Sequence, residues 1–374
     1  MKLTVFLLSL IFFSSYTFAQ SEFYTVTGKV IDKNSTLPLA GASVFAQNTT
    51  FGVATDAEGN FKLKLPNGGY ELTVTFTGYE TESIRITTSS VDNKNMIIEV
   101  KPKEKSMEEV SIVATSEVKD GWQKYGSFFT ENFIGKTQTS RQCVIKNPEV
   151  LRFFFSRKRN RLKVITNEPL VVMNNALGYK ITFAIDSFTY EYANNTSQFT
   201  GYPLFEELQG TTEQQAGWKQ NRMQAYLGSQ LHFMRSLYDK TIDEEGFEVQ
   251  FIITKNGRET PIPLKNIYSA LNYLKDDSTS TVEFKPNQPE IAIIFNNEKP
   301  EQAYIDLDPK ANKNFQVSTL NITPGESIII EENGYYYDQK DIITNDYWGF
   351  KKVGDMLPYD YDPEPDETPS AKGE

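Results

Sequence analysis

Residues 61–76 read FKLKLPNGGYELTVTF, and this stretch decides the fold of the first part of the chain. Apolar residues alternate with Lys, Glu or Thr on both sides of the PNGG segment. A period of two is typical of strands with one buried face. Pro, Asn and Gly are residues that tight reversals favour. The stretch therefore predicts two β-strands, 61–65 and 70–76, joined by a turn.

Strand-like segments with turn residues between them surround this stretch. They are 24–31, 38–45, 52–55, 82–87 and 96–100. Short strands at regular spacing with a period of two predict a small antiparallel β-sandwich. We expect this sandwich to occupy residues 23–101.

Four patterns in this region resemble a known family. They are Gly28-Lys29-Val30-x-Asp32, Pro38-Leu39-x-Gly41-Ala42-x-Val44, Gly52-x-x-Thr55-Asp56-x-x-Gly59-x-Phe61 and Tyr70-x-Leu72-x-Val74-x-Phe76-x-x-Gly78-Tyr79. Together they look like the carboxypeptidase-regulatory-like domain, a transthyretin-like β-sandwich. This domain resembles the N-terminal extension of many Bacteroidetes TonB-dependent receptors. The resemblance implies a companion module and not a peptidase.

The first 19 residues have the pattern of a secretory signal peptide. Lys2 precedes an uncharged apolar run, and small and polar residues lead to Ala19. The run is shorter than the ~20 residues that a membrane-spanning helix needs. We expect cleavage after Ala19, export to the periplasm or the outer membrane, with the cell surface as a further option, and no transmembrane segment in the mature chain.

Composition narrows the classes of function. The formal charge of the 374 residues is −11, and an acidic chain is a poor candidate for binding nucleic acid. The chain has one Cys, Cys143, so no intramolecular disulfide is expected even after export. Stability must come from hydrophobic cores, and the length predicts more than one of them.

Residues 102–118 are predicted to link the sandwich to the rest of the chain. Within them, residues 107–114 read MEEVSIVA and resemble the segment that follows the same domain in TonB-dependent receptors. There the segment offers an extended strand to a periplasmic energy transducer, a known mode of peptide recognition. An ordinary linker or edge strand is the alternative. The residues after 118 are too few for a large receptor barrel.

The remainder is predicted to be β-rich with one or two amphipathic helices. We expect one domain over 119–246, with helices at 119–134 and 212–239, and a C-terminal β-rich domain over 247–358. Residues 359–374 are rich in Asp, Glu and Pro and predict a disordered acidic tail. The fold class is therefore mainly β throughout.

A second resemblance concerns this larger part. It looks like a group of Bacteroidetes proteins that carry one regulatory-like domain and no barrel, and it implies an architecture but no activity. The segments that carry it are Asn147-Pro148-Glu149-Val150-Leu151, Asn175-Ala176-Leu177-Gly178-Tyr179-Lys180-Ile181, Arg222-x-x-Ala225-Tyr226-x-Gly228-Ser229-x-x-His232-Phe233, Tyr347-Trp348-Gly349 and Met356-Leu357-Pro358.

The single histidine, His232, limits the chemistry. A zinc metallocarboxypeptidase needs several protein ligands, usually two His and a carboxylate, so that site cannot form. Ser229 lies three residues before His232, where both would share one helix face, a poor geometry for attack. Cys143 is expected to be a small core residue. We expect no catalytic residue, no metal site and no cofactor.

Two clusters are candidates for binding. Aromatic side chains near the C-terminus predict either a platform for a sugar or peptide or, by default, core packing. Basic side chains predict either contact with anionic lipid headgroups or a solvated hairpin turn. The aromatic cluster is Tyr335, Tyr336, Tyr337 and Trp348, and the basic cluster is Arg157, Lys158, Arg159 and Arg161.

These features favour a non-enzymatic cell-envelope protein that binds an outer-membrane protein or a glycan. Two alternatives stay open. One is an envelope hydrolase with a carboxylate pair that the sequence does not single out. The other is a structural module at the cell surface or secreted from the cell.

Overall fold

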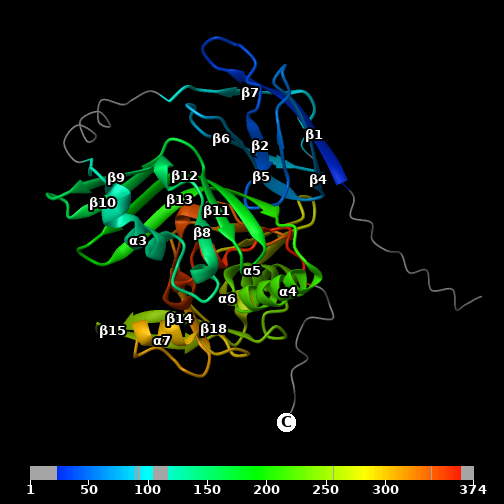
Figure 1. Ribbon diagram of the computed structural model, residues 1–374. Coiled ribbons are helices and arrows are strands. Elements are labelled where there is room, and N and C mark those ends of the chain that lie inside the picture. Colours follow the sequence, from blue (N-terminus) through cyan, green and yellow to red (C-terminus); the bar gives the residue numbers. More distant parts are fainter. Residues whose placement is uncertain are drawn as a thin grey trace, which may run out of the picture.

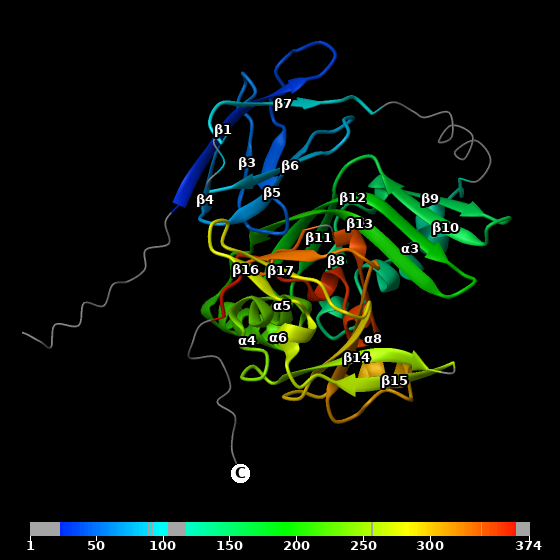
Figure 2. The same cartoon turned by 180° about the vertical axis from the view of Figure 1, so that it is seen from behind.

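The computed structural model describes residues 23–88, 90, 93–103, 117–255, 257–337 and 339–363. Three units follow one another along the chain and pack together: an N-terminal module, a middle unit and a C-terminal unit (Figures 1 and 2). All three are built mainly from β-strands, which confirms the predicted fold class. Within these ranges, no helix is long and apolar enough to cross a membrane.

The N-terminal module is a sandwich of two sheets. One sheet has the order β4-β1-β7, with β1 (Phe23–Asp32), β4 (Asn60–Pro66) and β7 (Met96–Val100). The other has the order β3-β2-β5-β6, with β2 (Ser43–Ala46), β3 (Gly52–Ala54), β5 (Gly69–Thr75) and β6 (Glu82–Thr87). The PNGG turn carries the chain from the first sheet to the second. One pair, β1 with β7, is parallel, so the sandwich is not wholly antiparallel.

The core of the module follows from the alternation in its sequence. Along β4 the apolar side chains are buried and the lysines between them are exposed. Leu63 and Leu65 from this strand face Leu72 and Val74 from the second sheet in one hydrophobic cluster. A one-residue shift of either strand would turn these side chains to solvent, and burial therefore determines the register.

The middle unit is a six-stranded sheet covered by a helix. Its strand order is β8-β11-β12-β10-β9, and β13 pairs with β12. Phe129 and Phe133 of the helix are fully buried and contact Phe153, Phe183 and Phe188 of the sheet. The elements are α3 (Gly121–Phe133), η1 (Ser140–Gln142), β8 (Cys143–Ile145), η2 (Pro148–Val150), β9 (Leu151–Ser156), β10 (Arg161–Thr166), β11 (Leu170–Asn174), β12 (Tyr179–Glu191) and β13 (Thr196–Glu207).

The C-terminal unit has two sheets with short helices around them. The larger sheet has the order β15-β14-β18-β19-β21 and the smaller β16-β17-β20. Its strands are β14 (Phe247–Lys255), β15 (Arg258–Pro263), β16 (Leu274–Asp276), β17 (Thr281–Phe284), β18 (Glu290–Phe295), β19 (Gln316–Ile322), β20 (Ile328–Glu331) and β21 (Ile342–Asn345). Its helices are α5 (Gln230–Asp239), α6 (Ile267–Ala270), α7 (Gln302–Leu307), η3 (Gln339–Asp341) and α8 (Asp346–Phe350). The turn η4 (Val353–Asp355) follows α8 and packs Val353 in the core of the middle unit.

Two helices stand where the sequence predicts one helix over 212–239. The first, α4 (Thr212–Tyr226), ends before Gly228, whose φ of 70° is left-handed. Ser229 then caps α5 by accepting a hydrogen bond from the His232 N–H at 3.1 Å.

The break lets the two helices pack in different cores. Met223 of α4 is buried in the core of the middle unit, whereas Phe233 and Met234 of α5 are buried in the core of the C-terminal unit. Along these two helices the change from one core to the other falls at this break and not at residue 246, and Val353, Leu357 and Tyr361 return to the core of the middle unit.

Residues 359–361 pack against the folded units and do not form part of a disordered tail. Tyr361 is buried, and the Arg235 guanidinium donates to the carbonyls of Tyr359 at 3.0 Å and Tyr361 at 2.8 Å. These aromatic residues pack against the folded units despite their acidic surroundings. The expectations for residues 1–19, 107–114 and 364–374 lie outside the described residues.

The capping box of α4 allows a first prediction. Thr211 Oγ accepts from the Gln214 N–H, and the Gln214 side chain accepts from the Thr211 N–H at 2.9 Å. Thr211→Ala should lower the free energy of unfolding by about 1 kcal/mol, because one backbone donor of the first turn loses its partner. Urea denaturation at pH 7 measures this, with Thr211→Ser as the control that keeps the cap. An Ala variant as stable as the Ser variant would show that the cap contributes nothing.

Candidate functional site

A cavity of about 1020 Å³ lies where the three units meet. Its wall combines the β2–β3 turn and strands β5 and β6 of the module with β13 of the middle unit. The helices α4 and α5 and the segments around β20 and α8 complete it. This volume is at the upper end of the range of ligand pockets, and such pockets often form between domains. The site therefore depends on how the module docks.

The turn between β2 and β3 is the first docking contact. The Asn48 N–H donates to the Pro203 carbonyl at 2.7 Å, and the Tyr359 N–H donates to the Asn48 carbonyl at 2.7 Å. The Thr50 N–H donates to Asp360 Oδ1 at 2.9 Å. Asn48 has a φ of 55°, a left-handed conformation that Asn tolerates better than most residues. The turn is thus held between β13 and residues 359–360 by its own backbone.

A buried carboxylate makes the second docking contact. The Glu331 side chain is 3% exposed and accepts from the Tyr337 hydroxyl and from the Gly69 N–H of the module. Arg85 lies 3.9 Å from the Glu331 carboxylate, and its guanidinium lies 3.7 Å from the centre of the Tyr337 ring. Burial raises the pKa of Glu331, although Tyr337 and Arg85 act in the opposite direction. Next to this group, Tyr335 donates to Glu71 at 3.4 Å.

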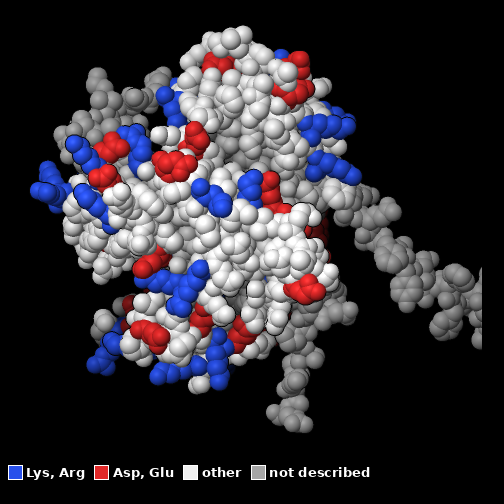
Figure 3. All heavy atoms as spheres, in the orientation of Figure 1, with Lys and Arg blue, Asp and Glu red and all other residues white. Residues whose placement is uncertain are grey.

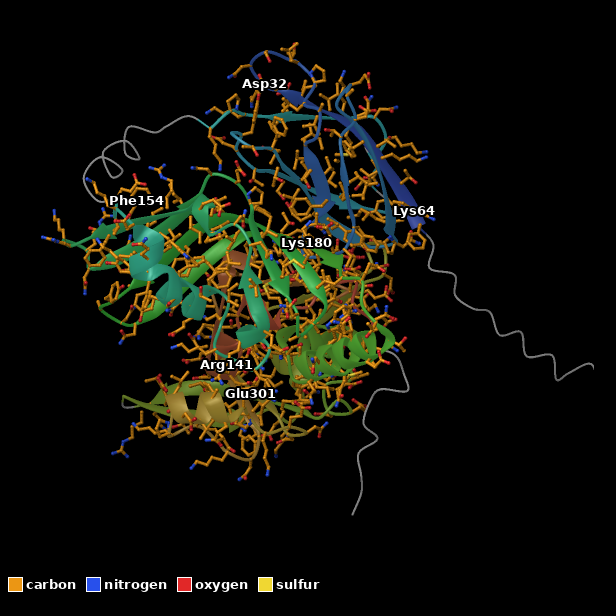
Figure 4. The ribbon with its side chains drawn as sticks, in the orientation of Figure 1. Asp32, Lys64, Arg141, Phe154, Lys180 and Glu301 are labelled. Atoms are coloured by element: carbon orange, nitrogen blue, oxygen red, sulfur yellow. The ribbon has the colours of Figure 1, made fainter. Side chains whose placement is uncertain are left out.

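A third polar group joins the middle unit to the C-terminal unit, and its Asp355 and Lys351 belong to the wall of the cavity. Asp355 accepts from the Thr137 hydroxyl at 2.9 Å and from the Thr139 hydroxyl, and Lys351 lies 3.7 Å from it. Lys351 also pairs with Glu301. Glu301 Oε2 in turn accepts from the Gln138 N–H of the middle unit at 3.2 Å, and Figure 4 labels Glu301 at this border. Burial alone would lower the pKa of Lys351, but the Asp355 and Glu301 carboxylates outweigh burial and raise it.

Glu298 is a carboxylate in the wall of the cavity, and burial disfavours its ionised form. Burial raises the pKa of Glu298, while Lys351 and a hydrogen bond from Gln316 partly offset the rise. Gln316 Nε2 lies 3.4 Å from Glu298 Oε2. A carboxyl group that is easily protonated can donate a hydrogen bond as well as accept one.

This raised pKa predicts a pH dependence of stability. Because the folded-state pKa of Glu298 lies above its unfolded value, the favourable contribution is present at low pH and is lost as pH rises through the folded pKa. The stability of the wild type relative to Glu298→Gln should therefore increase when pH falls from 7 to 5. Urea denaturation at both pH values measures this, and Glu326→Gln, at an exposed turn, is the control. A difference that does not change with pH would contradict the prediction.

The candidate nucleophiles Ser229 and Cys143 and the candidate base His232 are not arranged for catalysis. The His232 Nδ1 atom accepts from the Gly228 N–H at 3.2 Å, and Nε2 lies 3.1 Å from Glu245. Because Nδ1 accepts, the ring proton sits on Nε2 and is donated to Glu245, so neither nitrogen is free for Ser229. Burial raises the pKa of the Cys143 thiol to about 12, which disfavours the reactive thiolate. Among the described residues, no group of three or more His, Cys, Asp or Glu could hold a metal ion.

The four predicted aromatic residues lie together, but not as an exposed platform. Tyr335, Tyr337 and Trp348 are buried and Tyr336 is half-buried, and all four belong to the wall of the cavity. Their polar atoms are engaged within the protein: Trp348 Nε1 donates to the Gly228 carbonyl at 2.7 Å, and the Tyr336 hydroxyl accepts from Gln230. They shape the cavity more than they offer an open stacking surface.

The basic cluster lies elsewhere. Arg157, Lys158 and Arg159 are exposed in the turn between β9 and β10, while Arg161 pairs with Glu191. None of the four belongs to the wall of the cavity. Figure 3 shows Lys and Arg side chains at the edge of the molecule over this hairpin, with Asp and Glu side chains beside them. Contact of this turn with anionic headgroups stays a proposal.

Comparison with known proteins identifies the N-terminal module. Residues 26–112 match the model of the CarboxypepD_reg-like domain family. The module is a carboxypeptidase-regulatory-like domain. This confirms the resemblance that the four sequence patterns indicate. The match covers less than half of the chain, so the family describes this domain alone.

One curated relative is a TonB-dependent receptor of Formosa agariphila. It is 31% identical over 114 residues, which cover 29% of this chain and 10% of the receptor. The chain therefore spans about a tenth of the curated relative that it matches.

Two solved DUF3823 family proteins also resemble the chain. The protein from Bacteroides ovatus is 14% identical and overlaps 50% of this chain and 83% of its own, with a TM-score of 0.18. The protein from Parabacteroides merdae is 13% identical and overlaps 53% and 86%, with a TM-score of 0.18. Scores this low carry no argument about the present fold.

Sequence reasoning did not find the polar residues of the wall. Asn48 lies far along the chain from Glu298, Gln316 and Lys351, and each of the four sits in a turn, at a strand end or at a helix end. One signal was present, because the segment Tyr347-Trp348-Gly349 that carries the second resemblance contributes Tyr347 and Trp348 to the wall.

Proposed function

We propose that this protein is a non-enzymatic binding protein of the cell envelope, and that its ligand occupies the cavity between the three units. The observation that carries the proposal is the shared wall: the regulatory-like domain is docked and contributes Asn48, Glu71 and Arg85 to the same cavity as the other two units. A domain that served only as a tether would not need to enclose a cavity with its partners.

Two further observations support a binding role over catalysis. The hydrogen bonds of His232 and Ser229 leave no base beside a nucleophile, and burial disfavours the Cys143 thiolate. The similarity to a TonB-dependent receptor and the regulatory-like domain support an envelope location, in the periplasm or at the outer membrane. In that setting a glycan is the ligand proposed for the cavity, and an outer-membrane protein is the partner proposed for the outer surface of the molecule.

Retention of an envelope component tests this proposal. The purified protein is incubated with the fraction of a native envelope extract below the size of proteins, re-isolated, and examined by native mass spectrometry. We expect a bound species that dissociates chemically unchanged. Gln224→Trp should fill the cavity and abolish retention, whereas Gln220→Trp, on the same exposed side of α4 but outside the wall, should not. No retained species, or retention that Gln224→Trp leaves intact, would contradict the proposal.

A hydrolase is the second candidate, and Glu298 is the observation that favours it. Its raised pKa in the wall of a cavity is a property of general acids. If the retained species were released as cleavage products and Glu298→Gln stopped the cleavage, the hydrolase would replace the binding protein. Release of intact ligand from both proteins would exclude this candidate.

A further inference from the structure

Three successive cations occupy the turn between β9 and β10. Arg157, Lys158 and Arg159 are exposed, and we call these three residues the basic tip. Both ribbon views show the hairpin ending at the edge of the molecule, away from the C-terminal unit (Figures 1 and 2). None of the three side chains has a hydrogen bond or an ion pair with a residue that the structure describes. The tip therefore presents its three charges to the surroundings.

The shape of the turn does not require these charges. Asn160 has a left-handed φ of 46°, and its carbonyl accepts from the Tyr192 N–H at 3.1 Å. The Arg159 N–H donates to Ser156 Oγ at 3.3 Å. Backbone groups and uncharged side chains make these contacts, so neutral residues at 157–159 would form the same turn. Three like charges side by side repel one another, and an anionic partner outside the chain would remove this repulsion.

The carboxylates nearest in the sheet are already paired. Arg161 pairs with Glu191, and Arg152 donates to Glu117 through two hydrogen bonds of 2.7 Å and 2.9 Å. The neighbouring hairpin turn, 193–195, reads Ala-Asn-Asn and adds no charge. An excess of positive charge therefore stays at the tip. The chain as a whole carries −11, but charges farther away than about 8 Å are largely screened at physiological ionic strength.

Half-buried aromatic residues lie directly below the tip. Phe155 of β9 contacts Tyr125 of α3 and Tyr192 of β12, with ring centres 6.4 Å and 5.9 Å apart. The hydroxyls of both tyrosines have no hydrogen-bond partner among the described residues. Tyrosine is enriched where proteins meet the membrane–water interface, because its ring suits the apolar side and its hydroxyl the polar side.

The form of the tip favours a bilayer over a protein as its partner. A stable protein interface buries about 800 Å² on each side, and a protruding turn has few neighbouring residues with which to build it. A bilayer surface needs only opposite charge and groups that suit the headgroup region. We infer that the basic tip binds the surface of a bilayer that contains anionic phospholipids, with Tyr125 and Tyr192 at the level of the headgroups. This contact does not depend on the ligand of the cavity.

Flotation of the full chain with lipid vesicles tests the inference. The vesicles contain phosphatidylcholine alone or phosphatidylcholine with an equal amount of phosphatidylglycerol, and soluble polyglutamate represents an acidic polypeptide. One variant carries Arg157→Gln, Lys158→Gln and Arg159→Gln. The matched control carries Lys62→Gln, Lys64→Gln and Lys94→Gln, which remove the same charge from exposed positions of the regulatory-like domain.

We expect the wild type to bind the anionic vesicles, and to bind them less as salt is added. The tip variant should bind about a hundredfold more weakly, at about fivefold for each basic residue, and the control should stay within about threefold. Equal binding to both kinds of vesicle would overturn the electrostatic contact. Equal losses in the tip variant and the control would overturn the assigned site. Binding of polyglutamate without binding of vesicles would assign the tip to an acidic polypeptide and overturn the bilayer.

A fluorescent reporter locates the contact independently of its strength. Asn194→Trp places an indole on the exposed turn beside the tip, and Asn296→Trp places one on an exposed turn of the C-terminal unit. Anionic vesicles should shift the emission of the first variant to shorter wavelength and leave that of the second unchanged. A shift in the second variant alone, or in neither while the protein floats with the vesicles, would show that another surface binds the bilayer.

Discussion

Replacing Gly69 by valine should release the regulatory-like domain from the other two units. A Cβ at this position would lie 2.0 Å from Glu331 Oε1 and 2.5 Å from the Tyr337 hydroxyl. Both groups are buried and bonded to each other, so neither can move without leaving Glu331 unpaired. Overpacking together with an uncompensated buried carboxylate should remove about 3 kcal/mol of docking free energy. Valine is a good strand former, so the domain itself should stay folded.

Two measurements detect the release. Small-angle X-ray scattering should give a larger radius of gyration, and thermal unfolding should split from one transition into two because the units no longer unfold together. Lys62→Val puts the same side chain on an exposed position of β4 and should change neither. A Gly69→Val protein with the scattering curve and the single transition of the wild type would show that this contact does not hold the domain. The affinity for any ligand of the cavity should also fall when docking is lost.

Replacing Lys351 by methionine should destabilise the join between the middle and C-terminal units. The change keeps the length of the side chain but leaves the Glu301 and Asp355 carboxylates without their shared cation. The Lys351 side chain is 26% exposed, and the Asp355 side chain is 4% exposed. Breaking a mostly buried pair of this kind costs about 3 kcal/mol.

Urea denaturation at pH 7 measures this loss. Because the pKa of Lys351 is raised, its favourable contribution is complete at neutral pH and is lost only as pH rises through that raised value. Lys299→Met, an exposed lysine of the same wall, is the matched control and should change stability little. A Lys351→Met protein as stable as this control would show that Asp355 and Glu301 need no cation.

Docking makes the regulatory-like domain part of the wall of the cavity in this chain. The polar contacts of Asn48, Thr50, Gly69 and Arg85 join it to segments far along the sequence, and the Asn48–Leu357 bond spans 309 residues. A domain held in this way acts as one wall of a shared site. Substitutions in its β2–β3 turn should therefore affect ligand binding as directly as substitutions in the C-terminal unit.

The broken helix shows where periodicity misleads. Residues 223, 227, 231, 234 and 238 continue one apolar stripe, which predicts a single helix. The stripe is continuous although it serves two cores. Met223 lies in the core of the middle unit, Met234 lies in the core of the C-terminal unit, and Leu227 between them packs against both. Gly228 and Ser229 were the local signal: a Gly ends helices readily and a Ser begins them.

The C-terminal segment shows the limit of composition. Acidic residues and prolines predict disorder from residue 359 onward, yet Tyr359 and Tyr361 pack and accept hydrogen bonds from Arg235. Composition is an average over a window of sequence, and it does not show that the two tyrosine side chains can be buried against other parts of the protein. This burial is possible only after α5 and the β2–β3 turn have come together.

The sequence by itself determined the features that depend on neighbouring residues. Alternation along β4 and β5 specified a sandwich with a buried face, the four patterns identified the regulatory-like domain, and a single histidine excluded a zinc peptidase site. The tertiary structure alone decided the cavity. Asn48, Glu298, Gln316 and Lys351 come to line one cavity through docking contacts between distant segments. The burial of Asn48 and Gln316 and the shifted pKa values of Glu298 and Lys351 arise only when those segments exclude water from one another.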